Sequence, residues 1–155
     1  MSRLRSARTI AAVAPLLLLL AAADTPFSSG LWEIRNLPGV ATLDGRALEE
    51  LPLGPIKIQT ICLGPAEASK PITFLTRDLG ADCTVKTASL SRGQVQVAGT
   101  CPNQLEGPEG SFQLGGKIGA AGYDVDFATT AFGDNGRMTF SGKMTGRRVG
   151  SCPRG

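Results

Sequence analysis

Residues 82–101 read DCTVKTASLSRGQVQVAGTC, and their pattern predicts a β-hairpin with a cysteine near each end. Polar and apolar residues alternate on both sides of a central Ser91-Arg92-Gly93 segment. That segment suits a three-residue turn in which the glycine takes a left-handed conformation. Leu90 then pairs with Gln94, and the same register continues outward to both ends of the hairpin.

The register of this hairpin also sets the pairing of its cysteines. Cys83 falls directly opposite Cys101, where the Cα atoms of antiparallel neighbours lie about 4.5–5.5 Å apart and a disulfide can form. Cys62 and Cys152 then form a second disulfide, between an early strand and the C-terminal one. Cysteine count and spacing leave one other connectivity open, in which Cys62 pairs with Cys83 and Cys101 pairs with Cys152.

The cysteine spacing and the absence of histidine argue against other cysteine chemistry. The chain has four cysteines, no C-x-x-C pair and no histidine. Zinc sites use closely spaced Cys and His ligands, redox dithiols use C-x-x-C, and a cysteine nucleophile is normally activated by histidine. We therefore expect no metal ion and no cofactor. The absence of histidine also excludes Ser-His-Asp hydrolysis.

The rest of the chain after residue 23 shows the alternation of antiparallel strands. Clear strand segments lie at residues 30–34, 56–63, 111–118, 123–132 and 137–144. With the hairpin they predict an all-β fold, a single antiparallel meander of about seven strands with one buried and one wet face. Glycines inside these strands favour a curved or barrel-like sheet, with a two-sheet sandwich as the alternative. One short helix is expected near residues 66–70, ending at Pro71.

Residues 1–23 have the pattern of a secretory signal peptide. Three arginines precede an uncharged apolar run from Ile10 to Ala23, which is short for a membrane span and ends in small residues. Cleavage after Ala23 would leave one disulfide-stapled β domain at residues 24–155, periplasmic or secreted and without a transmembrane segment. The leader holds three of the sixteen Lys and Arg residues and none of the thirteen Asp and Glu residues. The exported chain would then carry no net charge, so we expect no nucleic-acid partner.

Few side chains stand out as functional candidates. Trp32 is the only tryptophan, and we expect a core anchor, with a ligand contact as the alternative. Arg147 and Arg148 are expected to pair with carboxylates on a neighbouring strand, with an anion or partner contact as the alternative. Asp124 and Asp126 share one strand face about 7 Å apart, a spacing that acid–base catalysis could use. The same spacing is that of a solvated strand face, which we expect here.

Several motifs occur in an order that resembles a known family. They are GLWEI at 30–34, ICLGPAEASKP at 61–71, Asp82-Cys83, GTC at 99–101 and MTGRRVGSC at 144–152. Together they resemble domain of unknown function 3617, a family of small exported proteins of Gram-negative bacteria. The resemblance covers nearly all of residues 24–155 and implies periplasmic or secreted placement. It implies no activity, cofactor or ligand, because the family has no established catalytic residues.

These observations predict an exported cell-envelope protein that is not an enzyme. It would be a binding or structural module, for a small ligand or another envelope protein. One alternative is a carrier of a small hydrophobic ligand in a barrel-like cavity lined by Trp32, Phe112, Phe127 and Met138. A second alternative is an unrecognised hydrolase, which would need its paired aspartates in a pocket.

Overall fold

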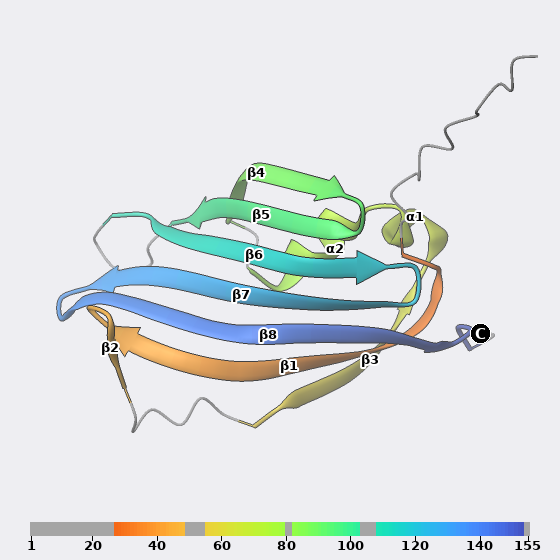
Figure 1. The fold of residues 1–155 in the computed structure, drawn as a ribbon, viewed down its shortest axis with the longest axis horizontal. Coiled ribbons are helices and arrows are strands. Elements are labelled where there is room, and N and C mark those ends of the chain that lie inside the picture. The colour runs from red at the N-terminus through yellow and green to blue at the C-terminus, as the bar shows by residue number, and fades with distance from the viewer. Residues whose placement is uncertain (1–26, 49–54, 80–81, 103–107, 154–155) are drawn as a thin grey trace, which may run out of the picture.

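The computed structural model describes residues 27–48, 55–79, 82–102 and 108–153, whose strands form one antiparallel sheet (Figure 1). The order along the sheet is β2-β1-β8-β7-β6-β5-β4, and β3 also pairs with β1. The strands are β1 Gly30–Leu43, β2 Arg46–Ala47, β3 Lys57–Leu63, β4 Thr84–Ser91, β5 Gln94–Cys101, β6 Gly110–Gly119, β7 Gly122–Gly133 and β8 Gly136–Gly150. The predicted all-β meander is confirmed. Within the described ranges β4 pairs only with β5, so the sheet is open and not a closed barrel.

The β4–β5 hairpin forms as predicted, but its turn is one residue shorter than expected. Ser91 pairs with Gln94, so the turn consists of Arg92 and Gly93. Both residues have positive φ, 51° and 72°. A two-residue turn with both residues in the left-handed region has a twist that matches the twist of the flanking strands. The prediction of a three-residue turn was therefore wrong.

The two cysteines of the hairpin still meet, because a bulge compensates for the shorter turn. The register shifts between Val85 and Thr87, where β4 carries one extra residue. Beyond it, Thr84 pairs with Thr100, and the Cα atoms of Cys83 and Cys101 lie 4.1 Å apart. The predicted Cys83–Cys101 disulfide is confirmed.

The second predicted disulfide, Cys62–Cys152, is also confirmed, with Cα atoms 5.4 Å apart. It joins β3 to the segment that follows β8. These two elements lie on opposite sides of β1, since Leu31 pairs with both Cys62 and Gly150. The disulfide therefore ties together the three strands at this end of the sheet, and no cysteine is left free.

The expected short helix is present, and a second one follows it. Helix α1 is Pro65–Ala68, α2 is Pro71–Thr76, and a single 3₁₀ turn, η1, is Arg77–Leu79. Pro71 was expected to end a helix, but it begins α2, because the first helical position needs no backbone donor. Phe74 and Leu75 are buried on α2, so the second helix forms through its contact with the sheet.

The sheet has two chemically different faces. The helix face, toward α1 and α2, carries the buried side chains, among them Trp32 and Ile34 from β1, Val97, Phe112, Leu114 and Val125. The open face carries charged side chains at the alternate positions, such as Glu33 and Asp124. This is the predicted division into one buried and one wet face.

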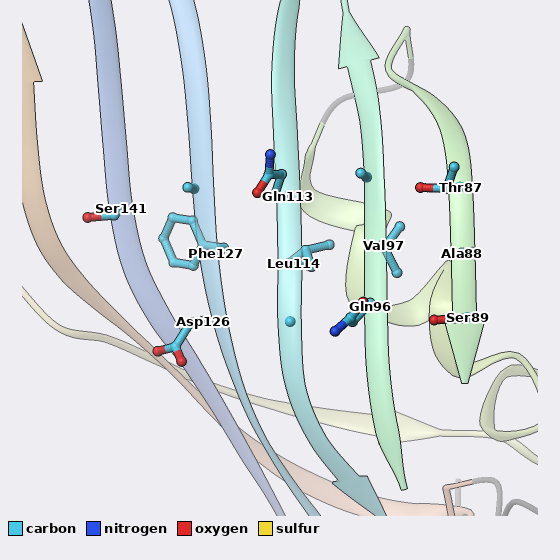
Figure 2. A pocket seen from close by; sticks show the side chains of 13 residues that line it. Thr87, Ala88, Ser89, Gln96, Val97, Gln113, Leu114, Asp126, Phe127 and Ser141 are labelled. Atoms are coloured by element: carbon cyan, nitrogen blue, oxygen red, sulfur yellow. The ribbon is translucent and has the colours of Figure 1, made fainter. Parts of the chain in front are cut away.

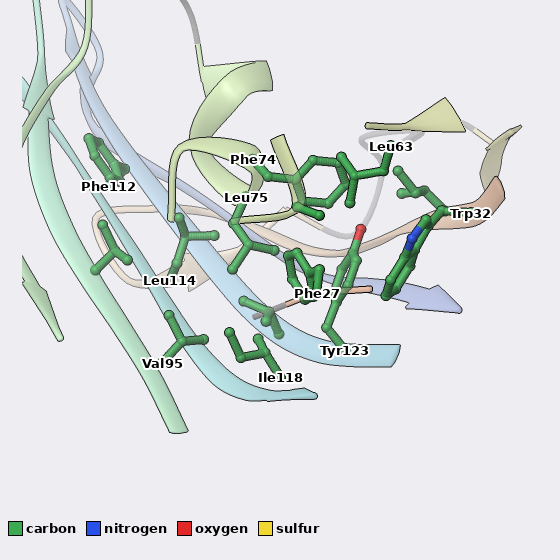
Figure 3. Packing of buried hydrophobic residues seen from close by; sticks show 14 residues of the cluster. Phe27, Trp32, Leu63, Phe74, Leu75, Val95, Phe112, Leu114, Ile118 and Tyr123 are labelled. Carbon is green, nitrogen blue, oxygen red and sulfur yellow. The ribbon is translucent and has the colours of Figure 1, made fainter. Parts of the chain in front are cut away.

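An aromatic cluster fills one end of the helix face (Figure 3). The ring centroid of Phe27 lies 5.2 Å from Trp32, 5.4 Å from Phe74 and 5.7 Å from Tyr123. The indole Nε1 of Trp32 donates to the Ser28 carbonyl at 2.9 Å. Tyr123 also lies directly over Gly146, where an added Cβ would come within 2.6 Å of its Cζ. The glycine thus makes room for a ring in the core.

The predicted leader, residues 1–23, lies outside the described residues. Within the described part of the chain, none of the helices has the length and apolar character needed to span a membrane.

Candidate functional site

The two faces of the sheet carry hollows of different character. The larger is a trough of about 730 Å³ across the middle of the open face (Figure 2). Hydroxyl, amide and carboxylate groups from five neighbouring strands line it: Thr87, Ser89, Gln96, Gln113, Asp126 and Ser141. Its floor contains the small residues Ala98, Gly115 and Ala128. Polar groups of this kind normally face water on a half-buried sheet, and Val97, Leu114 and Phe127 also border the trough.

The aspartates considered for catalysis lie on the open face. Lys143 Nζ is 2.7 Å from Asp124 Oδ1 and 3.7 Å from Asp126 Oδ1. The two aspartate side chains are 57% and 74% exposed. The hydrogen bond that Lys143 donates to Asp124 raises the pKa of Lys143 above its usual value, against a lowering effect of burial and with further raising contributions from the two negative charges. The two carboxylates share one ammonium group at the surface, and Asp126 also borders the trough.

Arg147 and Arg148 are held in different ways. Arg147 pairs with Glu33 across β1 and β8, with Nη2 and Nε both 3.1 Å from Oε1. Arg35 reaches the same oxygen at 3.0 Å. The hydrogen bond from Arg35 lowers the pKa of Glu33, and the charge of Arg147 adds to this against the opposing effect of burial. Arg148 instead donates to the main-chain carbonyl of Ser29 at 2.8 Å. Both arginines are therefore bonded to their own chain.

The second hollow is an apolar pocket of about 380 Å³ on the helix face, beside α2 and η1. Its apolar wall consists of Leu37, Pro38, Pro55, Leu75, Leu79, Leu114, Phe127 and Met144. A few polar side chains complete the lining: Asn36, Lys57, Asp78 and Thr129. Sites for small molecules have this composition, a mostly apolar hollow of roughly 300–1,000 Å³ with a few polar groups. We refer to it below as the apolar pocket.

The apolar pocket exists because the helices cover only part of the helix face. Leu75 and Leu79 lie over it from the helical side, and β1, β6, β7 and β8 form its floor. Strand β1 reaches the pocket by continuing past Pro38 to Leu43, with a register shift against β8 between Pro38 and Ala41. A proline is tolerated at such a bulge, where its missing N–H breaks no regular ladder bond.

Sequence reasoning missed the part of β1 that lines this pocket. Pro38 and Gly39 suggested a break, so β1 was expected only at residues 30–34. The signal that could have found the longer strand is the Asp44-Gly45 pair, which makes a tight turn into β2 with φ of 48° and 82°.

The four residues expected to line a carrier's cavity are not brought together. Trp32 and Phe112 are fully enclosed in the packed core, with 0% and 1% of their surface exposed. Phe127 lines the apolar pocket, whereas Met138 pairs with Leu43 and Ala131 further along the sheet. The cavity present is thus smaller than a lipocalin-like barrel interior, and it lies beside the aromatic cluster.

Among the described residues, Tyr123 is the buried group whose ionisation is strongly displaced. Burial raises the pKa of Tyr123 to about 12, with smaller opposing contributions from the charges of Arg77 and Asp78. An unfolded tyrosine titrates near pH 10, so the folded state holds this proton more tightly. Its contribution to stability is complete below pH 10 and is lost as the pH rises from about 10 to about 12.

We expect tyrosinate absorbance to report this displacement directly, because Tyr123 is the only tyrosine in the chain. The folded protein should titrate with a midpoint near pH 12, and the same protein in denaturant should titrate near pH 10. The Tyr123→Phe variant should lose less stability than the wild type over that interval. A folded-state midpoint near pH 10 would mean that the hydroxyl is solvated and the cluster is looser than described.

Among the described residues, no three Cys, Asp or Glu side chains lie close enough together to hold a metal ion. Residues 27–152 match the family model described as protein of unknown function, DUF3617. No curated protein and no solved structure matches the chain.

Proposed function

Because this chain belongs to the DUF3617 family, whose description gives no activity, we propose a function from its own geometry. The protein is an exported, non-catalytic binding protein of the cell envelope, and it holds a small apolar molecule in the apolar pocket. The observation that carries this proposal is the pocket itself. It places the side chains of Leu114, Phe127 and Met144 around an unfilled volume of about 380 Å³, beside a core that is otherwise closely packed.

The pocket supports binding because filling it would remove apolar surface from water. Each square ångström of apolar surface buried contributes about 25 cal/mol. A ligand would also restore the contacts that the side chains around an empty hollow lack. The polar groups at its lining, Asn36, Lys57, Asp78 and Thr129, are outnumbered by apolar ones, so they can set the orientation of a ligand in a mostly apolar site.

The placement of the charged groups supports a role without catalysis. Asp124 and Asp126 lie on the open face, away from the pocket, and both contact Lys143. The chain has no histidine to act as a general base near neutral pH. For these reasons the hydrolase alternative is not the function that we propose.

Export is supported by the leader pattern and by the cysteines. Residues 1–23 have a positively charged start and an apolar run that ends in small residues. All four cysteines form disulfides, which persist mainly in oxidising compartments. Periplasmic or secreted placement is the expectation that follows.

Two adjacent positions on β7 give a matched test of the pocket. Thr129 lines the apolar pocket and Ala128 lines the trough on the opposite face. We expect Thr129→Phe to fill the pocket and to weaken the binding of naphthalene, a bare apolar probe, at least tenfold in a calorimetric titration. Ala128→Phe adds a ring one residue away and should leave the affinity unchanged. Equal affinities in the two variants, or no binding to the wild type, would contradict the proposal.

A further inference from the structure

Asn36, which lines the apolar pocket, has a side-chain acceptor that no described residue satisfies. The side-chain oxygen Oδ1 of Asn36 is shielded from solvent and accepts no hydrogen bond from any described residue. It is the one buried side-chain polar atom in the described ranges with this property. Buried acceptors are rarely left without a donor, so an unpaired one in the wall of a cavity calls for a partner outside the chain.

The cross-strand neighbours of Asn36 provide no donor for its side-chain oxygen. On the helix face Asn36 lies between Met144 of β8 and Lys57 of β3, its two cross-strand partners. The side chain of Met144 has no N–H or O–H to donate. Lys57 is exposed and lies where β3 begins, at the rim of the pocket. Neither neighbour donates to the oxygen, and no other described residue does.

The charges at the rim lie on side chains other than Asn36. Lys57 and Asp78 both line the pocket, and Asp78 is paired with Arg77, whose Nε lies 3.5 Å from its Oδ1. What Asn36 itself can bind is therefore decided by its own oxygen, which can only accept a hydrogen bond. A carboxylate brought close to Asn36 Oδ1 would set two acceptors against each other, because an ionised carboxylate has no proton to donate.

From these observations, and resting on the proposed function, we infer that the ligand is a small apolar molecule with a neutral hydrogen-bond donor. The donor is a hydroxyl or an amide N–H, and Asn36 is the residue that recognises it. The terminal torsion of an asparagine side chain is soft, so a modest rotation turns the oxygen toward the donor as the ligand enters. The apolar body then contacts Phe127 and Met144.

A pair of probes that differ only in the donor tests this inference. Naphthol carries a hydroxyl donor, and its methyl ether has the same ring system with the donor removed. In calorimetric titrations of the oxidised full chain at neutral pH, we expect naphthol to bind about five- to tenfold more tightly than the ether. This ratio corresponds to one net hydrogen bond.

Two variants identify the acceptor. Asn36→Leu is close in size and removes the acceptor, so it should bind the two probes with equal affinity. Asn36→Gln retains the carboxamide on a longer stem and should recover part of the preference. Its recovery also shows that loss of preference in the leucine variant does not come from a collapsed pocket.

The outcomes separate this inference from the function on which it rests. Equal binding of both probes to the wild type overturns the donor inference and leaves the apolar pocket in place. A preference that persists in Asn36→Leu overturns the assignment to Asn36. Failure of both probes to bind the wild type contradicts the proposed function, and the donor inference falls with it.

Discussion

Removing the Cys62–Cys152 disulfide by the double change Cys62→Ser and Cys152→Ser is expected to lower the free energy of unfolding by about 4–5 kcal/mol. The two cysteines are 90 residues apart in the chain, so the disulfide excludes many conformations of the unfolded state. It also holds β3 and the end of β8 on either side of β1. A loss of this size is a large fraction of the 5–15 kcal/mol that stabilises a typical domain. Urea unfolding followed by circular dichroism measures it.

The other disulfide provides the control. Cys83 and Cys101 are only 18 residues apart, and replacing both by alanine should cost about 3 kcal/mol in the same model. The hairpin they close should still form, because its turn and ladder do not depend on the disulfide. If the Cys62/Cys152 variant proves the more stable of the two, loop length does not govern the contribution of these disulfides.

Replacing Trp32 by alanine is expected to cost about 3–5 kcal/mol, the range for truncating a large aromatic side chain in a core. Trp32 is completely buried, lies 5.2 Å from Phe27 and 6.3 Å from Tyr123 between ring centroids, and donates a hydrogen bond to Ser28. Its loss leaves a cavity among rings that also contact α2. Thermal unfolding and urea unfolding both report the change.

Trp32→Phe separates packing from the hydrogen bond. The smaller ring can retain part of the contact with Phe27 but cannot donate to Ser28, so we expect a loss of roughly 1–2 kcal/mol. The binding of apolar probes should change little, because Trp32 does not line the apolar pocket. A tryptophan that could be removed with little loss of stability, but with loss of binding, would instead be a ligand contact.

The sequence was most informative where local geometry decides the outcome. Alternation along β7 placed Tyr123 and Val125 on the buried face, and Asp124 and Asp126 on the wet face. The GDNG sequence at residues 133–136 is typical of a tight hairpin turn, and Gly133 pairs with Gly136 where β7 turns into β8. The cysteines of the hairpin also met, although through a two-residue turn and a bulge in β4 in place of the predicted three-residue turn.

The features that the sequence did not predict depend on contacts between segments that are distant in the chain. Nothing near Pro71 indicates that its helix will be stabilised by Phe74 packing against Phe27 and Tyr123. Similarly, Pro38 reads as a break until β8 is known to run beside it and to accept the bulge. The apolar pocket is formed by the two elements that the sequence did not predict. The segment α2 and η1 covers it, and the extension of β1 forms one wall. Asn36 could therefore not be identified as a binding residue from sequence alone.

The apolar pocket lies next to the most firmly stabilised end of the sheet. The aromatic cluster and the Cys62–Cys152 disulfide stabilise one end of the sheet. Further along the same face the helical segment ends at Leu79, and the apolar pocket lies beside it. A firmly held end can support a neighbouring pocket that is not completely filled, since the stability lost by leaving apolar side chains unpacked is supplied by the core beside it.

The most direct test of the account is native mass spectrometry of the protein recovered, without denaturation, from the cells that make it. We predict a retained small molecule on the wild-type chain, and its loss from the Thr129→Phe variant but not from the Ala128→Phe variant. A wild-type protein that carries no small molecule, or a bound molecule that remains when the pocket is filled, would contradict the claim that the apolar pocket is the functional site.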